Sequence, residues 1–434
     1  MAHLHLENIG PIQVVDIDLT RVNIFIGPQS SGKSTIAKMI SFCLWIEKKV
    51  ATTLTEKIFS SAGDFVTTAE MYHKMHNYFN DSTVVRYESD VISINYAKDT
   101  LTIKLLDKFI YKRKKIVYMP SDRNLVAMPE LEKLTLTNKT NLQSFTFDWL
   151  NARNTFDKSH KLNLLDLDMQ YYYDSTEQIY KDKIVHSNGK TYDISLYDAS
   201  SGLQSITPLV LMLHYYNNQY FNDFEKFTSY EKQQELQQLA DKIDSIFPFP
   251  THNEHLDSTD SKSYSQTIEH TGNVFLHMEI KNKRKKMYQQ LTTPYTTDFI
   301  IEEPEQNLFP EAQEALLYWT LEEIKRGNDG NYLFITTHSP YILFALNNCL
   351  MGGLVKDKVS NQDFSSEKGW IDVKDVSIYE IHDGKLQSIQ DNDGLLNNNY
   401  LNQANKKIKK QSLRVRFCRV MEIWIETGIA LPTD

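Results

Sequence analysis

A glycine-rich stretch near the N-terminus has the residue types that bind phosphate. Residues 27–34, with the sequence GPQSSGKS, match the pattern G-x-x-x-x-G-K-[ST] in full. In this pattern backbone N–H groups and the lysine contact phosphate oxygens, and the final hydroxyl ligates Mg²⁺. The alternative is a glycine turn that only starts a core helix. With an apolar strand directly before it, we expect ATP to bind at Gly27, Pro28, Gln29, Ser30, Ser31, Gly32, Lys33, Ser34 and Thr35, with Ser34 as a metal ligand.

Two further segments place acids and a histidine directly after apolar strands. Phe299–Ile301 precede Glu302 and Glu303, and the strand over 331–336 is followed by His338. Alone, each segment is more simply a solvated strand end or a loop histidine. The carboxyl ends of parallel strands, however, are where ligands of such sheets bind. Beside a phosphate-binding loop, we expect Glu302 to hold the water shell of Mg²⁺, Glu303 to polarise the attacking water, and His338 to hydrogen-bond the γ-phosphate or that water.

A fourth segment, residues 200–204 with the sequence SSGLQ, opens an apolar helix. A Ser-Ser-Gly run at a helix N-terminus can bind an anion, although serine and glycine are also common helix caps. From this segment we expect Ser201, Gly202 and Gln204 to contact nucleotide.

In this order the segments resemble the ABC-type ATPase family. The resemblance implies an ATP- and Mg²⁺-dependent ATPase whose two copies pack head to tail, the signature of one covering the ATP held by the other. The chain departs from the family at Leu203, which replaces the second glycine of Leu-Ser-Gly-Gly-Gln, and at Glu302, which replaces an aspartate. The matched positions are 27–34 for Walker A, 200–204 for the signature, 299–303 for Walker B with the catalytic glutamate, 305–308 for the D-loop, and His338 for the switch histidine.

A narrower resemblance is to the standalone bacterial ATPases of the OLD, Septu and PARIS type. It is carried by residues 301–310 (IEEPEQNLFP), by Thr-His-Ser-Pro downstream, and by residues 118–123 (YMPSDR), which look like a segment those proteins place near the nucleotide. The resemblance implies a switch in anti-phage defence that works with a separate effector protein such as a nuclease. It covers residues 1–50, 116–125, 195–215 and 296–390, and no TOPRIM nuclease domain is evident.

The surrounding elements predict an α/β fold: a P-loop NTPase of the ABC type with a mixed or parallel sheet. Helical periodicity over 204–216 and 231–247 predicts a largely helical insertion lobe that carries the signature. Polar residues 251–272 predict a surface loop, and residues 121–195 show no clear pattern. The predicted domains are 1–125 and 296–390 for the two halves of the ATPase lobe, 126–295 for the insertion lobe, and 391–434 for a basic C-terminal tail.

The bulk composition is that of an ordinary globular protein. The chain has 434 residues, of which 41% are hydrophobic and 24% charged, and its net charge is -9. No apolar run is long enough for a membrane span, and no secretory signal is seen, so we expect a cytoplasmic protein. Cys43, Cys349 and Cys418 lie far apart, which disfavours a disulfide framework or a zinc site.

Basic runs leave a second possibility open. Residues 281–286 (KNKRKK), 111–115 (YKRKK) and the tail over 406–419 are rich in lysine and arginine. Such runs can contact nucleic-acid phosphates, but they are more often solvated faces. Tyr171–Tyr173 can stack on bases, although core packing is the simpler expectation. Neither insertion shows sustained heptads, so we expect no long coiled-coil arms.

Three functions therefore compete. The first is an ATPase switch that closes as a homodimer, or a higher oligomer, and acts through a separate effector. The second is an ATP-dependent clamp of the DNA-repair type, with the basic runs as contacts. The third is a nuclease with Asp391 and Asp393 as metal ligands, against which Asp-x-Asp-Gly is also a common turn. A transporter subunit is disfavoured because its signature is normally fuller.

Overall fold

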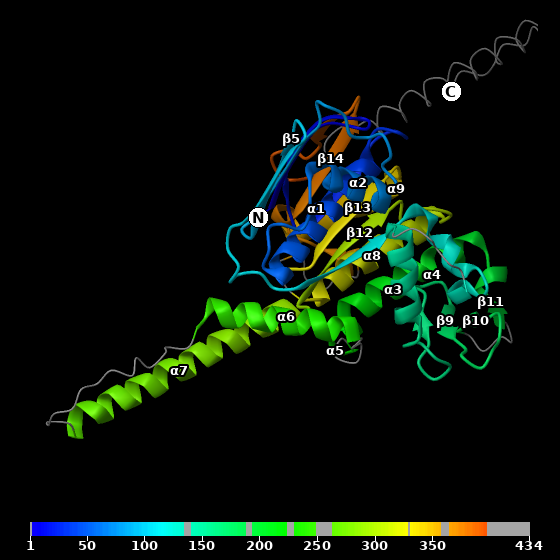
Figure 1. Cartoon of the computed structure of the whole chain (residues 1–434). Helices are drawn as coiled ribbons and strands as arrows, with labels where there is room; N and C mark the ends of the chain where they lie inside the picture. Colours follow the sequence, from blue (N-terminus) through cyan, green and yellow to red (C-terminus); the bar gives the residue numbers. More distant parts are fainter. Residues whose placement is uncertain are drawn as a thin grey trace, which may run out of the picture.

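The computed structural model describes residues 2–133, 140–187, 193–223, 230–248, 263–328, 330–356 and 364–396. Its centre is an eleven-stranded mixed sheet in the order β6-β5-β4-β1-β2-β15-β14-β3-β13-β12-β7 (Figure 1). The strands are β1 (Ala2–Ile9), β2 (Ile12–Leu19), β3 (Val22–Ile26), β4 (Val84–Glu88), β5 (Ile92–Ala97), β6 (Thr100–Leu105), β7 (Lys114–Met119), β12 (Thr296–Glu302), β13 (Tyr332–Thr337), β14 (Val376–His382) and β15 (Lys385–Ser388). The predicted α/β fold with a mixed sheet is confirmed.

The sheet has a parallel half and an antiparallel half. β14, β3, β13, β12 and β7 run parallel to one another, whereas β2, β1, β4, β5 and β6 form an antiparallel meander. β15 joins the two halves and pairs antiparallel with β14 and parallel with β2. Every residue of β3 and of β12 is buried, as expected for central parallel strands covered on both faces. The strands expected over residues 3–26 and 84–119 are all present.

Each face of the parallel half packs into its own core. Successive residues of β12 alternate, so Phe299 and Ile301 join one core and Ile300 joins the other. The Ile300 core contains α1 (Lys33–Thr53) and α2 (Ala62–His73). The Phe299 core contains α3 (Asn141–Arg153), α4 (Ser201–His214), α8 (Pro310–Arg326) and α9 (Pro340–Val355). Helix α1, predicted over residues 34–46, extends about two turns further, to Thr53.

Beside this body lies a side lobe, residues 140–223, that contains more β-structure than its sequence indicates. A four-stranded antiparallel sheet, β11-β10-β9-β8, accompanies α3, α4 and α5 (Tyr220–Asp223). The described part of the insertion over 126–295 is largely helical, as predicted, and this small sheet is an addition that the sequence did not indicate. The strands are short, which explains why no pattern was visible: β8 (Leu162–Asn163), β9 (Met169–Tyr173), β10 (Asp182–His186) and β11 (Asp193–Ser195).

Aromatic residues of the side lobe are used for packing. Tyr171 and Tyr172 are buried, and their hydroxyls donate to Asp182 at 2.5 Å and to Asp193 at 2.7 Å. Tyr171 also packs against Trp149 of α3, with ring centroids 5.6 Å apart. Base stacking by these two tyrosines is thereby excluded in this conformation.

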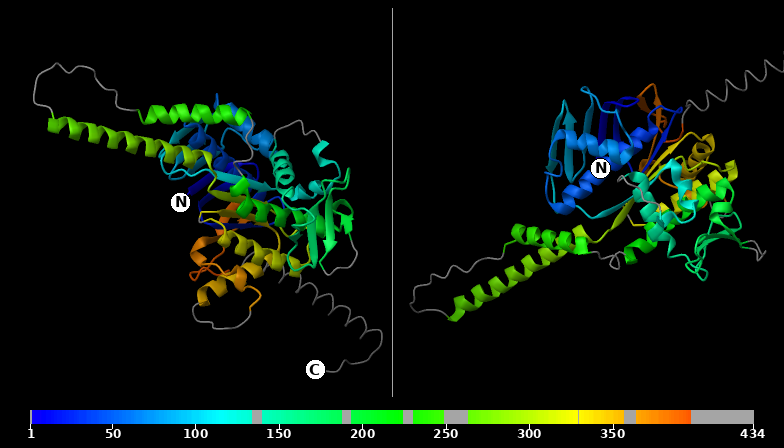
Figure 2. Two further views of the ribbon diagram at one scale, coloured as in Figure 1. Left: turned by 90° about the horizontal axis from the view of Figure 1, so that it is seen from below. Right: turned by 45° about the vertical axis from the view of Figure 1, so that its right-hand side comes forward.

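A helical arm projects from the body, although the sequence shows no sustained heptads and predicts no long coiled-coil arms. α6 (Tyr230–Ile246) and α7 (Ser263–Thr292) lie side by side, and α7 extends well beyond the body (Figures 1 and 2). At 1.5 Å per residue α7 is about 45 Å long. Its start at Ser263 also shortens the loop predicted over 251–272, of which residues 251–262 lie outside the described ranges. The two helices touch over a short stretch near the body, where Arg284 donates to the Phe247 carbonyl at 2.9 Å, and so a heptad pattern does not arise.

Within the ranges just given, no helix has both the length and the apolar character needed to cross a bilayer.

Candidate functional site

The phosphate-binding loop connects the buried strand β3 to α1, as the sequence predicts. Gly27 and Gly32 have φ angles of 153° and 109°, which side chains other than glycine rarely adopt. Neighbouring atoms also leave no room for a side chain. A Cβ at Gly27 would lie 2.4 Å from the Ile381 carbonyl oxygen, and one at Gly32 would lie 2.3 Å from Ile12. The glycines are therefore required by this backbone.

Lys33 begins α1 and points back into its own loop. Its Nζ donates to the carbonyl oxygens of Gly27 at 2.9 Å and Pro28 at 2.7 Å. Burial lowers the pKa of Lys33 to about 8, and the nearby Glu303 and Glu305 work against that shift. An ammonium held among backbone carbonyls in this way can exchange those contacts for phosphate oxygens without moving far.

A pocket of about 610 Å³ lies over the loop. It contains six of the twelve predicted nucleotide ligands, all from the P-loop segment, together with both predicted catalytic residues, which follow separate strands. This convergence of three distant segments is the main geometric finding of the site. The predicted residues that line the pocket are Gln29, Ser30, Gly32, Lys33, Ser34, Thr35, Glu303 and His338.

Glu303 and His338 form an ion pair at the C-terminal ends of β12 and β13. The Nε2 atom of His338 lies 2.8 Å from Glu303 Oε1, and its Nδ1 lies 3.3 Å from the Gly27 carbonyl oxygen. The hydrogen bond between them raises the pKa of His338 and lowers that of Glu303. Glu303 also has a φ of 48°, an uncommon backbone conformation for a residue with a side chain.

Glu302 lies beneath this pair and does not line the pocket. Its carboxylate accepts a hydrogen bond from the Tyr118 hydroxyl at 2.6 Å, and a longer one from the Ser121 N–H at 3.4 Å. Burial raises its pKa. The Ser34 hydroxyl and the Glu302 carboxylate supply the hard oxygen donors that Mg²⁺ prefers, and Mg²⁺ commonly keeps several of its waters. The types of donor present therefore fit Mg²⁺.

Arg123 connects the acidic strand to the signature helix, a role that the sequence did not indicate. It is fully buried and donates to the carbonyl oxygens of Glu302 at 2.8 Å and Glu303 at 2.6 Å. The same guanidinium donates to the backbone oxygen of Ser205 at 3.2 Å and to its hydroxyl at 3.1 Å. Arg123 thus joins α4 to the backbone of both acids through one side chain. The sequence marks residues 118–123 as a motif, but only the fold identifies the hydrogen-bond partners of Arg123.

The segment after Glu303 links the acids to the histidine strand. Glu305 Oε1 accepts the backbone N–H of His338 at 2.7 Å, and the Glu303 N–H donates to the Thr336 carbonyl at 2.8 Å. Gly202 of the signature lies beside this segment, since a Cβ there would be 3.0 Å from the Asn307 oxygen.

The signature residues stay outside the pocket of their own chain. Ser200 caps α4 by accepting the Leu203 N–H at 3.4 Å, and Ser201 is exposed. The Gln204 amide is turned away from solvent and donates to the carbonyl oxygens of Leu196 and Tyr197. Ser201, Gly202 and Gln204 therefore reach a nucleotide only if they belong to a second copy, or if the lobe moves.

Five residues that line the pocket were not predicted from the sequence. Gly10 and Pro11 lie between β1 and β2, and His76, Asn77 and Tyr78 follow α2. The Tyr78 ring packs directly on Gly10, and its carbonyl accepts the Gly10 N–H at 2.9 Å. His76, Asn77 and Tyr78 come from a stretch without hydrophobic periodicity, and only the packing of α2 on the meander brings them to the site.

The basic runs do not form one surface. Lys114 faces the buried Asp298 at 3.5 Å, and Lys115 contacts both Asp148 oxygens at 2.7 Å, so these two lysines are structural. On α7, Arg284 holds the arm to Asp244 at 2.9 Å, while Lys281, Lys283, Lys285 and Lys286 are exposed. The basic residues over 406–419 lie outside the described residues.

Asp391 lies in a turn. Its carbonyl accepts the Gly394 N–H at 3.0 Å, and its carboxylate accepts the N–H groups of Asp393 at 3.0 Å and Leu395 at 2.9 Å. The predicted turn is confirmed, and the carboxylate that a nuclease would use on metal is engaged by backbone.

No protein-family model matches the chain, and no curated protein matches it. Solved structures similar to it include an SMC head domain from Thermotoga maritima, at 11% identity, TM-score 0.36 and coverage of 89% of this chain and 97% of that one. A RecF–ATP structure has 11% identity, TM-score 0.28 and coverage of 89% and 98%. A nucleotide-free ATP-binding cassette of an ABC transporter has 12% identity, TM-score 0.23 and coverage of 89% and 90%.

TM-scores this low support no argument about activity. The fold follows from the topology itself: a P-loop between β3 and α1, parallel strands ending in the acids and the histidine, an antiparallel meander, and a side lobe whose helix begins with the signature. The chain has the fold of ABC-type P-loop NTPases.

Proposed function

We propose that this chain binds ATP with Mg²⁺ and hydrolyses it at the pocket formed by the P-loop, Glu303 and His338. The observation that carries the proposal is the convergence of Lys33, Ser34, Glu303 and His338 on one pocket. A glycine turn whose only role is to start a helix does not require an acid and a histidine from two other strands beside it.

Each residue has a role that its surroundings support. Lys33 leaves the carbonyls of Gly27 and Pro28 and pairs with the β- and γ-phosphates. Ser34 and, through water, Glu302 would hold Mg²⁺, which would supply positive charge against the charge that develops on the phosphates. Glu303, ionised because its pKa is lowered, orients and deprotonates the attacking water. His338 holds Glu303 in place through its 2.8 Å contact and offers a positive charge to the γ-phosphate.

The proposed working form is a head-to-tail homodimer. Ser201 and Gly202 are at the solvent-facing start of α4 and do not line their own pocket. In the dimer, the start of α4 from one copy would donate N–H groups to the γ-phosphate bound by the other. ATP then holds the two copies together, and its hydrolysis allows them to separate.

Replacing Glu303 by Gln tests the assignment. Glu303→Gln keeps the size of the side chain and its contact with His338 but removes the base, so turnover should fall by roughly 10²- to 10⁴-fold while ATP still binds. Glu311→Gln, an exposed acid at the start of α8, is the matched control and should hydrolyse at the wild-type rate. A Glu303→Gln protein with unchanged turnover would contradict the role of Glu303.

For the output of this cycle we propose a switch in anti-phage defence that acts on a separate effector. Support for it comes from the motif over 301–310, and the test is co-purification with the product of a neighbouring gene. A nuclease or other toxin-like partner whose activity depends on ATP would support the switch, and a permease would overturn it.

A nucleic-acid clamp is the second candidate, and the α6–α7 arm favours it. The exposed lysines Lys281, Lys285 and Lys286 lie on the arm without holding it to the body. The clamp predicts that duplex DNA stimulates ATP turnover and that reversing these three charges to Glu abolishes the stimulation. Arg284 must be kept, because its contacts with Asp244 and Phe247 hold α7 to α6. Stimulation that survives the reversal would count against the arm as the DNA contact.

A further inference from the structure

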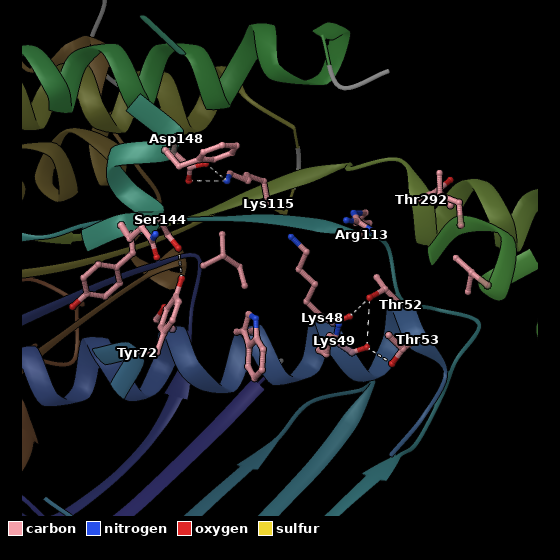
Figure 3. Close-up of a pocket in the computed structure, with 18 of the residues that line it drawn as sticks. Lys48, Lys49, Thr52, Thr53, Tyr72, Arg113, Lys115, Ser144, Asp148 and Thr292 are labelled. Carbon is pink, nitrogen blue, oxygen red and sulfur yellow. Dashed lines mark hydrogen bonds and ion pairs between the residues drawn. The ribbon is translucent and has the colours of Figure 1, made fainter. Parts of the chain in front are cut away.

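A second pocket lies at the other end of α1 from the P-loop. It has a volume of about 660 Å³ and lies between the C-terminal half of α1, the start of β7, α3 and α6 (Figure 3). Small-molecule sites usually measure about 300–1,000 Å³. None of the P-loop residues lines it. We call it the basic pocket and define it by Trp45, Lys48, Arg113, Lys115, Phe147 and Lys242.

The charge on its walls is strongly unbalanced. Lys48, Lys49, Arg113, Lys115 and Lys242 line it, and among the described lining residues Asp148 is the only acid. Asp148 is already engaged, because both of its oxygens lie 2.7 Å from Lys115 Nζ. Lys115 is thereby neutralised, while Arg113 and Lys242 donate to the carbonyl oxygens of Leu291 at 3.2 Å and Thr53 at 2.6 Å. Among the described lining residues, no second acid balances Lys48, Lys49, Arg113 and Lys242.

Lys48 is the clearest indication that an anion belongs here. Its side chain rises from α1 toward Arg113 and Lys115 (Figure 3). In the part of the chain that the structure describes, its Nζ makes no hydrogen bond or ion pair. Burial, reinforced by the charges of Arg113 and Lys115, lowers its pKa to about 7. Lys48 and Arg113 repel each other in this partly buried place, and a bound anion would reduce that cost.

Aromatic rings form another part of the wall. Phe147 lines the pocket with 64% of its surface exposed, although it lies on a helix whose neighbours Phe145 and Trp149 are buried. Trp45 and Tyr72 also line the pocket. An exposed ring beside a group of cations can stack on a planar ligand that carries negative charge.

We propose that the basic pocket binds a nucleoside phosphate, either as a free nucleotide or as the end of a nucleic-acid strand, at a site separate from the P-loop. The phosphate would lie between Lys48 and Arg113, and the base would stack on Phe147. The neighbouring Ser144 hydroxyl, 2.7 Å from the Tyr72 hydroxyl, is a further group able to bond the ligand.

Two elements connect the basic pocket to the P-loop site. About four turns of α1 separate Lys48 from Lys33. Strand β7 carries Lys115 at its start and Tyr118 near its end, where the Tyr118 hydroxyl donates to Glu302. If the chain hydrolyses ATP as proposed above, a ligand in the basic pocket contacts both α1, which carries Lys33, and β7, which carries Tyr118. It therefore changes the rate of ATP turnover at the P-loop site.

The test separates the two sites by mutation. The Lys33→Ala protein, whose P-loop site is disabled, is titrated by calorimetry with AMP, ADP, ATP, a 5′-phosphorylated dinucleotide and inorganic phosphate. We expect one nucleoside phosphate to bind per chain. Adding Lys48→Gln should weaken that binding roughly ten- to hundredfold, as expected for a lost charge-assisted contact. The exposed Lys104→Gln is the matched charge control and should leave binding unchanged.

The outcomes are distinct from those of the ATPase proposal. Binding of the mononucleotides identifies a free nucleotide as the ligand, and binding of the dinucleotide alone identifies a strand end. A Lys33→Ala protein that binds neither, or binds both regardless of Lys48→Gln, overturns the proposal, as does equal binding of inorganic phosphate. Thermal unfolding of each variant verifies folding, and quenching of Trp45 fluorescence, absent in Trp45→Phe, locates the ligand.

Discussion

The imidazole of His338 lies between two groups that only accept hydrogen bonds, the Glu303 carboxylate and the Gly27 carbonyl. Both of its nitrogens must therefore carry hydrogen, which makes it a cation. Its pKa is raised above the ordinary 6.5, and that of Glu303 is lowered below the ordinary 4.5. The stabilisation from the pair is complete between these two ordinary values. It is lost as pH rises through the raised pKa of His338, and as pH falls through the lowered pKa of Glu303.

A pH series measures this stabilisation. The free energy of unfolding of wild type should exceed that of His338→Gln by about 1 kcal/mol near pH 5.5, and the difference should shrink by about pH 9. Chemical denaturation at each pH gives both values. A difference that grows with pH would show that His338 is neutral in the folded chain.

Arg123 offers a second prediction at the same scale. Arg123→Lys keeps the charge but cannot reach Glu302, Glu303 and Ser205 together, so the two acids lose their common support. ATP turnover should fall at least about tenfold with little change in ATP affinity, because the P-loop is untouched. Arg86→Lys, on the exposed side of β4, is the control. An equal loss of ATP affinity and of ATP turnover would show that Arg123 supports folding in general and does not specifically position the acids.

At the scale of elements, the hairpin of β1 and β2 packs against the P-loop. Ile12 fills the space where a side chain at Gly32 would lie, and Gly32 has a φ of 109°. Gly32→Ala should cost about 1–3 kcal/mol of stability and abolish ATP binding. Ile12→Val in the same chain relieves the contact but not the backbone strain, so rescue should be partial. Gly63→Ala, within α2 and in ordinary surroundings, should be neutral or stabilising.

At the scale of the whole molecule, the head-to-tail dimer predicts that two defective chains complement each other. Lys33→Ala removes the phosphate contact and Gly202→Arg blocks the signature, so each protein alone should lack ATP turnover. Mixed in equal amounts, half of the dimers carry one intact composite site, and turnover should recover to about a quarter of wild type. A mixture that stays inactive would argue for a site completed within one chain.

The sequence predicted the parallel strands, the glycine-rich loop between β3 and α1, and the positions of Glu303 and His338 at the ends of their strands, because each is specified by a contiguous run of residues. It did not predict the side-lobe sheet, whose strands are too short for a period of two to be visible. His76 and Tyr78, and the partners of Arg123, also escaped prediction, because these contacts join segments far apart in the chain. Lys114 and Lys115 look like a solvated basic run in the sequence, and only the fold reveals Asp298 and Asp148 beside them.

The position of β14 and β15 between β2 and β3 has a consequence for biosynthesis. The strand that leads into the P-loop emerges from the ribosome early, but its neighbour β14 is made only after residue 376. Until then β3 lacks one partner, and the Ile381 carbonyl that packs against Gly27 is absent. A nascent chain can thus collapse its meander early, yet it completes the nucleotide loop only near the end of translation. Ribosome-bound chains arrested before β14 should not retain nucleotide, whereas chains arrested well after β15 should.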